Sequence, residues 1–403
     1  MQNAIKDTEQ KSYTTLDNCV ACGGSNLQQF LDLAEQPLAN NYHDGSGAGD
    51  SYQLGLNLCT DCYHTQLPVS VNPKAMFDHY LYVTGTSQTL RDYCDWFANM
   101  VSGQCAVGTI CDIASNDGTQ LDSFARLGWQ TMGIEPAENL VQDYKHYVIN
   151  DFAQNVVDPL QLDVITAQNV MAHTADPLGI MKNIKKWLKP RGRAFIQTSQ
   201  ANMFKNGEFD TMYHEHISFF CTSSMAALCH RAGLKLINVQ KTHIHGTSYV
   251  FTVTHDDGNH QDFFSIDPER YKMSTYQKFA DDAINTLASF SNRVKAFKKM
   301  GYKVVGYGAA AKGMTVLNAG KIQLDWIVDD NELKVGKMTP GMNIPILGSR
   351  TIAVDVPIVC VPLAWNFFDE IKAKVGHARG ELPTVFYKYF PKQEIYEQKH
   401  INA

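Results

Sequence analysis

The stretch Val107-Gly-Thr-Ile-Cys-Asp-Ile113, followed by Ala114-Ser-Asn-Asp-Gly118, decides the fold class. The apolar run predicts a buried strand, and the small and polar residues after it predict a turn into a helix. A second apolar segment, Met132-Gly-Ile134, ends at Glu135 and Pro136. Because strands that alternate with helices form parallel sheets, we predict a Rossmann-like α/β domain.

The polar residues around this first turn indicate the kind of ligand. Glu135, at the end of the second strand, is placed to accept both ribose hydroxyls of an adenosine ligand. The turn contains Ser115, Asn116, Asp117 and a single glycine, Gly118, and it lacks the G-x-G-x-x-G of dinucleotide enzymes. Such a turn suits a ligand without a pyrophosphate and with a zwitterionic end, which describes S-adenosylmethionine. A doubly wound sheet with a different ligand is the alternative.

The strands that follow add residues to the same edge of the predicted sheet. Asp151 and Phe152 come after a third short strand, where an acceptor and an aromatic face can hold an adenine ring. The next strand, over 162–168, ends at Asn169. Ligands of doubly wound sheets bind at the carboxyl ends of the strands. We therefore expect these three residues, together with Asp112 of the first strand, to contribute to the cofactor site.

Four of the ten cysteines occur in two pairs, Cys19-Val-Ala-Cys22 and Cys59-Thr-Asp-Cys62. Thiolates separated by two residues bind one metal from a tight turn, and two such turns complete a tetrahedron. The spacing predicts a structural Zn²⁺ site, similar to a zinc ribbon with a long insertion, with no open position for substrate. Four unrelated core cysteines, or a redox pair, are the alternatives. Buried thiols are expected at Cys94, Cys105, Cys111, Cys221, Cys229 and Cys360.

Composition and charge are those of an ordinary globular protein. The 403 residues carry a formal net charge of −6 at pH 7, which argues against nucleic acid as a partner. The sequence has no run of about 18 apolar residues, so we expect no membrane partner. The polar N-terminus lacks the apolar core of a signal peptide, and we expect a cytoplasmic protein.

A second α/β pattern occupies the last third of the chain. Apolar residues at helical spacing over 271–300 predict a long helix, and the strand Lys303-Val-Val-Gly-Tyr-Gly308 follows it. The turn Gly308-Ala-Ala-Ala-Lys312 then leads into another helix. Backbone amides at a helix start, with a lysine beside them, suit a diphosphate. Further strands are expected over 324–330 and 356–362.

The segment Asp210-Thr-Met-Tyr213-His214-Glu215-His216 is the most specific motif of the chain. With it, the chain resembles the sugar C-methyltransferase family of deoxysugar pathways, which carries a Tyr-His-Glu-His signature. The resemblance covers nearly the full length, since the cysteine pairs, Tyr80-Leu-Tyr82-Val-Thr84, the first turn and Gly133-Ile-Glu135-Pro136 occur in the family's order. Departures are minor: Ala114 replaces a common glycine, and Thr84 replaces a frequent serine.

The resemblance implies three domains: a zinc-binding domain over 1–72, a Rossmann-like S-adenosylmethionine-binding methyltransferase domain over 73–256, and a Rossmann-like nucleotide-sugar domain over 257–403. It also implies methylation of C3 of a 4-keto-6-deoxy sugar linked to dTDP or GDP. Carbon is methylated through an enolate, which requires a base of near-neutral pKa and a group that stabilises the enolate oxygen. Histidine titrates in the required range.

The same resemblance implies roles for the catalytic residues. His216 is the base that removes the C3 proton, and Tyr213 hydrogen-bonds near the keto or enolate oxygen. Glu215 binds or orients sugar hydroxyls or a catalytic partner, and His173 is a further pocket residue. The role of His214 is open, because in an extended segment it lies on the same face as His216 and the two can exchange roles.

Other positions of the family pattern imply contacts with cofactor and substrate. Tyr82 completes the implied cofactor residues. His245 follows a strand in a stretch similar to the family's His-Gly-Gly-Ser, although a loop histidine near the site is equally compatible. For Lys312 the alternative is a solvent-exposed lysine at a helix start. The implied substrate-binding residues are His214, His245, Gly308, Lys312, Asn318, Asp329, Lys337, Trp365 and Asn366.

Competing functional classes explain fewer of these features. A nicotinamide-dependent sugar-nucleotide oxidoreductase accounts for the two α/β halves but requires a glycine-rich pyrophosphate loop, which the sequence lacks. A zinc-ribbon interaction protein accounts only for residues 19–62. A catalytic metal at His214-Glu215-His216 is disfavoured, because the H-E-x-x-H spacing that places two histidines on one helical face is missing. We therefore predict an S-adenosylmethionine-dependent methyltransferase.

Overall fold

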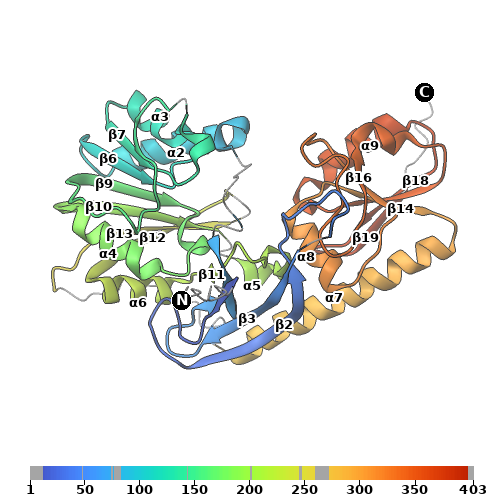
Figure 1. Ribbon diagram of the computed structural model, residues 1–403, viewed down its shortest axis with the longest axis horizontal. Helices are drawn as coiled ribbons and strands as arrows, with labels where there is room; N and C mark the ends of the chain where they lie inside the picture. Colours follow the sequence, from blue (N-terminus) through green and yellow to red (C-terminus); the bar gives the residue numbers. More distant parts are fainter. Residues whose placement is uncertain are drawn as a thin grey trace, which may run out of the picture. The chain divides into compact units, whose positions relative to one another are not determined.

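The computed structural model describes residues 12–47, 49–73, 76, 83–142, 144–199, 202–244, 247–258 and 272–397. It divides into two compact units, between which the chain passes several times (Figure 1). Unit 1 comprises Met1–Gln28, Leu58–Ala201 and Ile217–Ile266, and unit 2 comprises Gln29–Asn57, Asn202–His216 and Asp267–Ala403. The expected α/β fold class is confirmed, and the division into three domains stays a prediction.

Unit 1 is built on a sheet whose described strands have the order β12-β13-β10-β9-β6-β7-β8. The strands β10, β9, β6, β7 and β8 run parallel, and β13 pairs with β10 and β12 in antiparallel fashion. Their bounds are β6 Thr109–Ile113, β7 Gln130–Ile134, β8 Tyr147–Ile149, β9 Leu162–Gln168, β10 Leu188–Thr198, β12 Leu234–Thr242 and β13 Ser248–His255. The predicted strands around residues 107–113 and 132–134 are therefore neighbours, as a parallel sheet requires.

Helices cover both faces of this sheet (Figure 1). On one face, α2 (Gln88–Ser102) and α3 (Thr119–Arg126) contribute Phe97 and Phe124 to a core with Val164 of the sheet. On the other face, α4 (Pro177–Trp187) and α6 (Thr222–Ala232) enclose a second core. The sequence fixes the start of α4, because Asp176 accepts the backbone N–H of Gly179 at its first turn.

Shorter elements of unit 1 lie outside this sheet. Strand β1 (Tyr13–Thr15) pairs antiparallel with β5 (Val69–Val71), and β4 (Thr65–Gln66) pairs antiparallel with β11 (Ser218–Phe219). Three 3-10 turns connect the larger elements: η1 Thr84–Thr86, η2 Glu138–Leu140 and η3 Met171–His173. The two N-terminal cysteine pairs also lie within unit 1.

Unit 2 contains a sheet whose described strands have the order β16-β15-β14-β17-β18-β19. All neighbours are parallel except β19, which is antiparallel to β18. The bounds are β14 Lys303–Tyr307, β15 Trp326–Asp329, β16 Ile346–Gly348, β17 Ile358–Pro362, β18 Thr384–Lys388 and β19 Glu394–Glu397. Most of β2 (Leu27–Pro37) and β3 (Ser51–Cys59) also belongs to this unit.

The helices of unit 2 are α5 (Met203–Asn206), α7 (Met273–Lys299), α8 (Ala311–Ala319) and α9 (Phe368–Arg379), with the 3-10 turns η4 (Phe209–Thr211), η6 (Ser349–Ala353) and η7 (Trp365–Phe367). The long helix predicted over 271–300 is α7, and Phe290 on it stacks on Tyr389 after β18, with ring centroids 4.8 Å apart. No helix in the described part of the chain is long and apolar enough to span a membrane.

Candidate metal centre and active-site residues

Four cysteines of unit 1 form one cluster. The Sγ atoms of Cys19 and Cys62 are 3.6 Å apart, those of Cys22 and Cys59 are 3.5 Å apart, and all four lie within 4.8 Å of one another. Zinc bound at about 2.3 Å from four thiolates places the sulfur atoms about 3.8 Å apart. The cluster therefore fits a tetrahedral Zn²⁺, and a closed set of four sulfur ligands leaves no position for substrate.

The backbone around the first cysteine pair is held in a tight turn. The N–H of Cys22 donates to Sγ of Cys19 at 3.4 Å, as in metal-binding knuckles. Gly23 adopts a φ of +82°, which side chains with a Cβ rarely reach. Arg231 of α6 donates to the carbonyl of Ala21 at 2.7 Å. These contacts fix the cysteine pair to the helical layer of unit 1.

Glu135, directly after β7, binds the turn between β6 and α3. Its two carboxylate oxygens accept the backbone N–H groups of Asn116 and Ala137, both at 2.8 Å. Glu135 is 4% exposed, and burial raises the pKa of its carboxyl group. Because each carboxylate oxygen has a second lone pair, Glu135 retains acceptor capacity for ribose hydroxyls.

The segment before α2 lies against this turn. The backbone N–H of Thr84 donates to Oδ1 of Asn116 at 2.9 Å, and that of Gly85 donates to Oδ2 of Asp117 at 2.8 Å. Asn116 has a φ of +53° and Gly118 one of +81°, so the chain reverses sharply at this point. The family pattern included Thr84. Nothing in the sequence indicated, however, that the segment around Thr84 would bind the turn that contains Asn116 and Asp117.

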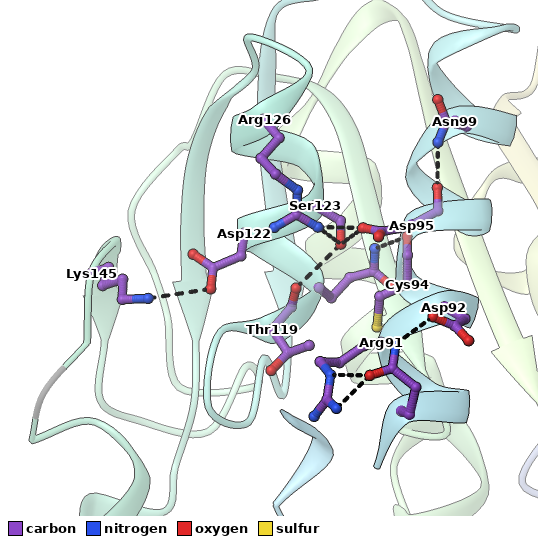
Figure 2. A network of polar contacts seen from close by, with 12 residues as sticks. Arg91, Asp92, Cys94, Asp95, Asn99, Thr119, Asp122, Ser123, Arg126 and Lys145 are labelled. Atoms are coloured by element: carbon purple, nitrogen blue, oxygen red, sulfur yellow. Dashed lines mark hydrogen bonds and ion pairs between the residues drawn. The ribbon is translucent and has the colours of Figure 1, made fainter. Parts of the chain in front are cut away.

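A network of polar contacts joins α2 to α3 (Figure 2). It holds the segment before α2 in place. Asp95 of α2 accepts the hydroxyl of Ser123 at 2.7 Å and forms an ion pair with Arg126, both on α3. Arg91 of α2 donates to the carbonyl of Gly85. Because exposed ion pairs contribute at most about 1 kcal/mol, the main effect of the network is to fix geometry.

The other predicted cofactor residues of unit 1 lie at neighbouring strand ends. Asp112 accepts the hydroxyl of Thr166 at 2.6 Å, and burial raises the pKa of Asp112 to about 7. Asp151 accepts the N–H of Phe152 at 2.7 Å, and Phe152 is 37% exposed, which leaves its aromatic face accessible. The structure thus brings to the carboxyl ends of β6–β9 Asp112, Ser115, Asn116, Asp117, Gly118, Glu135, Pro136, Asp151, Phe152 and Asn169.

Sequence reasoning predicted Asn169 at this edge but missed the polar side chains beside it. Gln168 and Gln197 are register partners at the ends of β9 and β10. Oε1 of Gln168, both amide atoms of Gln197, Oγ1 of Thr198 and Oδ1 of Asn169 are buried without a hydrogen-bond partner in the described part of the chain. Buried polar atoms are nearly always paired, so these mark a position for a polar ligand or water. The zwitterionic end of S-adenosylmethionine offers matching donors and acceptors.

In unit 2 the segment that contains His216 is a turn. Its backbone N–H donates to the carbonyl of Tyr213 at 2.8 Å, and its Nδ1 lies 2.8 Å from the carbonyl oxygen of Thr211. Because a carbonyl oxygen only accepts, Nδ1 carries a proton. Nε2 lies 2.9 Å from the hydroxyl of Tyr213. Neutral His216 therefore presents a lone pair at Nε2, as a general base requires.

His214 is directed to a different partner. Its Nε2 donates to the carbonyl of Tyr52 at 3.2 Å, and its side chain is buried, which lowers the pKa of His214 to about 4. The turn thus separates it from His216, whereas an extended segment would place both on one face. Glu215 accepts the side-chain N–H of Asn40 at 2.6 Å, and burial raises the pKa of Glu215.

Two contacts anchor this turn to other elements of unit 2. The hydroxyl of Thr315 in α8 donates to the carbonyl of Met212 at 2.7 Å. Asp210, which is 1% exposed, accepts the indole N–H of Trp365 at 2.5 Å. Nζ of Lys312 lies 5.4 Å from the centroid of the Trp365 ring. Two predicted substrate residues, Lys312 and Trp365, are therefore brought together beside the turn.

The remaining predicted substrate residues of unit 2 are more dispersed. Gly308 begins the turn into α8, and Asp329 ends the neighbouring strand β15. Asn318 lies in the last turn of α8, so the structure does not bring it to the start of that helix. Lys337 and Asn366 are exposed.

Three further predicted positions remain. Tyr82 and His245 lie outside the described residues. His173 is the last residue of η3 in unit 1, four residues after Asn169 at the end of β9. The catalytic and binding roles that the family resemblance gave to all of these residues stay predictions.

Comparison with known proteins identifies the type of enzyme. Family models match three consecutive parts of the chain: a zinc binding domain over 19–77, a methyltransferase domain over 86–239, and a C-methyltransferase C-terminal domain over 244–386. C-methyltransferase NovU of Streptomyces niveus is 26% identical over 391 residues, which are 88% of this chain and 91% of that protein. The chain is an S-adenosylmethionine-dependent methyltransferase.

More distant matches to this methyltransferase cover only part of it. A ubiquinone biosynthesis O-methyltransferase of Coxiella burnetii is 22% identical over 36% of this chain and 72% of that protein. The crystal structure of 1,6-didemethyltoxoflavin-N1-methyltransferase from Burkholderia thailandensis has a TM-score of 0.35 and 14% identity, and it covers 42% of this chain and 80% of that chain. The matches to the zinc and methyltransferase models confirm the predicted cofactors, and they do not favour an oxidoreductase.

Removal of one cysteine of the cluster should remove the metal. Cys22→Ser leaves three sulfur ligands, so the purified methyltransferase should contain clearly less than one zinc per chain and unfold at a lower temperature. Metal analysis and calorimetry measure the two effects. Cys105→Ser is the matched control, because Cys105 is half-buried outside the cluster and its replacement should leave zinc content unchanged. Full zinc content in Cys22→Ser would show that the cluster is not the site.

The burial of His214 predicts a pH dependence of stability. Its pKa falls from 6.5 to about 4 on folding, so between these values the unfolded chain binds a proton that the folded chain does not. This contribution to the free energy of unfolding is fully present above about pH 6.5 and declines toward pH 4, by at most about 3 kcal/mol.

His214→Gln keeps a side-chain N–H for the Tyr52 carbonyl but does not titrate. Its denaturant midpoint should therefore change less between about pH 7 and pH 4.5 than that of the parent protein. His230→Gln, at an exposed histidine of α6, should behave like the parent. An equal decline in His214→Gln and the parent would contradict the predicted burial effect.

Proposed function

We propose that the chain methylates C3 of a nucleotide-linked 4-keto-6-deoxy sugar, in the biosynthesis of a branched deoxysugar, with S-adenosylmethionine as methyl donor. The observation that carries the proposal is the bonding of His216, with Nδ1 held by the carbonyl of Thr211 and Nε2 beside the hydroxyl of Tyr213. A base and a hydroxyl donor side by side are what enolate formation next to a ketone requires.

The proposed reaction begins with proton removal by His216. The C3–H bond breaks, the proton moves to Nε2, and the electron pair moves into the enolate, whose oxygen accepts a hydrogen bond from Tyr213. The carbonyl of Thr211 keeps the Nδ1 proton in place, so Nε2 is the atom that gains and later loses a proton. The cofactor, when bound, supplies the electrophilic methyl group that the C3 carbanion takes up.

Different groups of residues support the two ligands. The turn 115–118 and Glu135 support cofactor binding, together with Oε1 of Gln168 and the amide atoms of Gln197, which have no hydrogen-bond partner among the described residues. For the sugar nucleotide, the support comes from Lys312 and Trp365 beside the turn that carries the base. Glu215 is assigned to a sugar hydroxyl. The three proposed domains, 1–72, 73–256 and 257–403, follow the order of the matching family models.

A hydrogen-exchange experiment separates base activity from methyl transfer. In D₂O, with S-adenosylhomocysteine and dTDP-4-keto-6-deoxyglucose, the protein should exchange the C3 proton for deuterium, which NMR detects. With S-adenosylmethionine, mass spectrometry should detect one added methyl group on the sugar. His216→Asn should lose exchange and methylation by about 10²- to 10⁴-fold, because proton transfer no longer has an acceptor.

The controls for this experiment test folding and specificity. His216→Asn should still bind S-adenosylhomocysteine in a calorimetric titration, because His216 is not among the proposed cofactor residues. His230→Gln should retain both exchange and methylation. Methylation by His216→Asn at nearly the parental rate would remove His216 as the base, and failure with dTDP- and GDP-linked keto sugars alike would remove the proposed substrate.

A further inference from the structure

The strand that follows the second cysteine pair also pairs with the segment that follows His216. Gln66 of β4 is the antiparallel partner of Ser218 in β11. One residue further along, the backbone N–H of Leu67 donates to the carbonyl of Ile217 at 2.9 Å. The backbone directly after the proposed base is therefore bonded to the N-terminal part of unit 1.

Gln66 connects this strand to the first cysteine pair. Gln66 is fully buried, and its Oε1 accepts the backbone N–H of Val20 at 2.9 Å. Its Nε2 donates to the carbonyl of Asn18 at 3.1 Å. Because Asn18 and Val20 flank Cys19, the side-chain amide binds the chain on both sides of a predicted zinc ligand. A single residue thus links Cys19 to a position two residues after His216.

The second cysteine pair has links of its own to this segment. The carbonyl of Cys62 accepts the hydroxyl of Ser223, in the first turn of α6, at 2.9 Å. Nε2 of the buried His64 lies 3.2 Å from the hydroxyl of Ser218. Buried polar side chains cost free energy unless they are hydrogen-bonded, and bonded ones specify one geometry. These contacts therefore fix the position of the segment in addition to burying it.

The same segment is also bonded to the cofactor edge of the sheet. The backbone N–H of Ile217 donates to the carbonyl of Ala172 at 2.7 Å. Ala172 lies in η3, three residues after Asn169 at the end of β9. Ile217 is thus bonded both to Leu67, after the cysteine pairs, and to Ala172, beside the proposed cofactor residues.

We infer that Gln66 is a positioning residue, through which the first cysteine pair and its metal hold the backbone after His216 in place. The inference rests on the proposed function, because it takes His216 as the base. The metal takes no part in proton or methyl transfer. A displacement of about 1 Å can cost about 10²-fold in rate, so a residue that fixes the backbone beside the base can affect turnover strongly.

Gln66→Met tests the coupling with little change in side-chain volume. The variant loses the bonds to Val20 and Asn18, so the rate of C3-proton exchange and the kcat of methylation should fall about ten- to a hundredfold. The KM for dTDP-4-keto-6-deoxyglucose and the affinity for S-adenosylhomocysteine should stay within about threefold, because the ligand contacts are unchanged. Metal analysis should still find about one zinc per chain, because all four cysteines remain.

Gln36→Met is the matched control. Gln36 is also a buried glutamine whose amide donates to a backbone carbonyl, that of Leu33 at 3.0 Å, but it lies in β2 of unit 2. Gln36→Met should lower the unfolding temperature and keep kcat. An equal loss of kcat in both variants would show general destabilisation and overturn the positioning role, as would full kcat in Gln66→Met.

Amide hydrogen exchange measures the same coupling without a substrate. In zinc-loaded Gln66→Met, peptides over 211–219 should exchange about tenfold faster or more than in the zinc-loaded parent, because the segment opens more often. Chelation of zinc from the parent should have the same effect, and added zinc should reverse it. Peptides over 109–113 and 130–134, in the sheet of unit 1, should not change in Gln66→Met. Exchange over 211–219 at the parental rate in Gln66→Met would overturn the inference.

If Gln66→Met loses its zinc or fails to bind S-adenosylhomocysteine, Ser218→Ala decides instead. It removes the contact with His64 and keeps the backbone pairing of β11 with β4. Amide exchange over 211–219 should rise and kcat should fall, each by about threefold or more. Parental values of both would overturn the inference.

The same measurements distinguish this inference from the proposed function. A parent protein that neither exchanges the C3 proton nor methylates any keto sugar would remove the proposed function, and faster amide exchange over 211–219 in Gln66→Met would then still show the coupling. A parent protein that methylates the sugar, with Gln66→Met equally active, would leave the proposed function and remove the positioning role.

Discussion

The rest of the structure depends on a carboxylate that joins the end of one strand to the turn after the preceding strand. Glu135 in unit 1 and Asp329 in unit 2 each accept a backbone N–H from that turn, at 2.8 and 2.6 Å. These N–H groups belong to the loops that lead into α3 and α8. The carboxylates satisfy them and keep the turns open toward the carboxyl edge of the sheet, where ligands of parallel sheets bind.

A structural metal centre needs all of its coordination positions filled, whereas a catalytic base needs an atom that is available for a proton. Four sulfur atoms within 4.8 Å close the coordination of Zn²⁺, so the ion stabilises the N-terminal pairs and has no position for chemistry. In the proposed reaction, by contrast, His216 gains and loses a proton, and its bond to the Thr211 carbonyl leaves Nε2 for that purpose. The cysteine cluster therefore serves stability, and the proposed reactivity lies in a different segment, around His216.

Local patterns in the sequence predicted the strands, the first turn, the long helix and the two cysteine pairs, because each of these is visible in a short stretch of the chain. Contacts between distant segments could not be predicted in the same way. Asn40 reaches Glu215 across 175 positions, and Asp210 reaches Trp365 across 155. Gln168 and Gln197 ended otherwise apolar strands, a signal that could have been noticed, but only the sheet register shows that they are neighbours.

The distinction between the two histidines shows most clearly what the backbone adds. In an extended segment His214 and His216 would share a face, and either could act as the base. The turn closed by the bond from His216 N–H to the Tyr213 carbonyl removes this equivalence. Protonating His214 would place a charge in a buried environment beside Tyr52, which its pKa of about 4 reflects. His216 has a hydroxyl beside Nε2 and a carbonyl oxygen at Nδ1, so its two ring nitrogens meet different partners from those of His214.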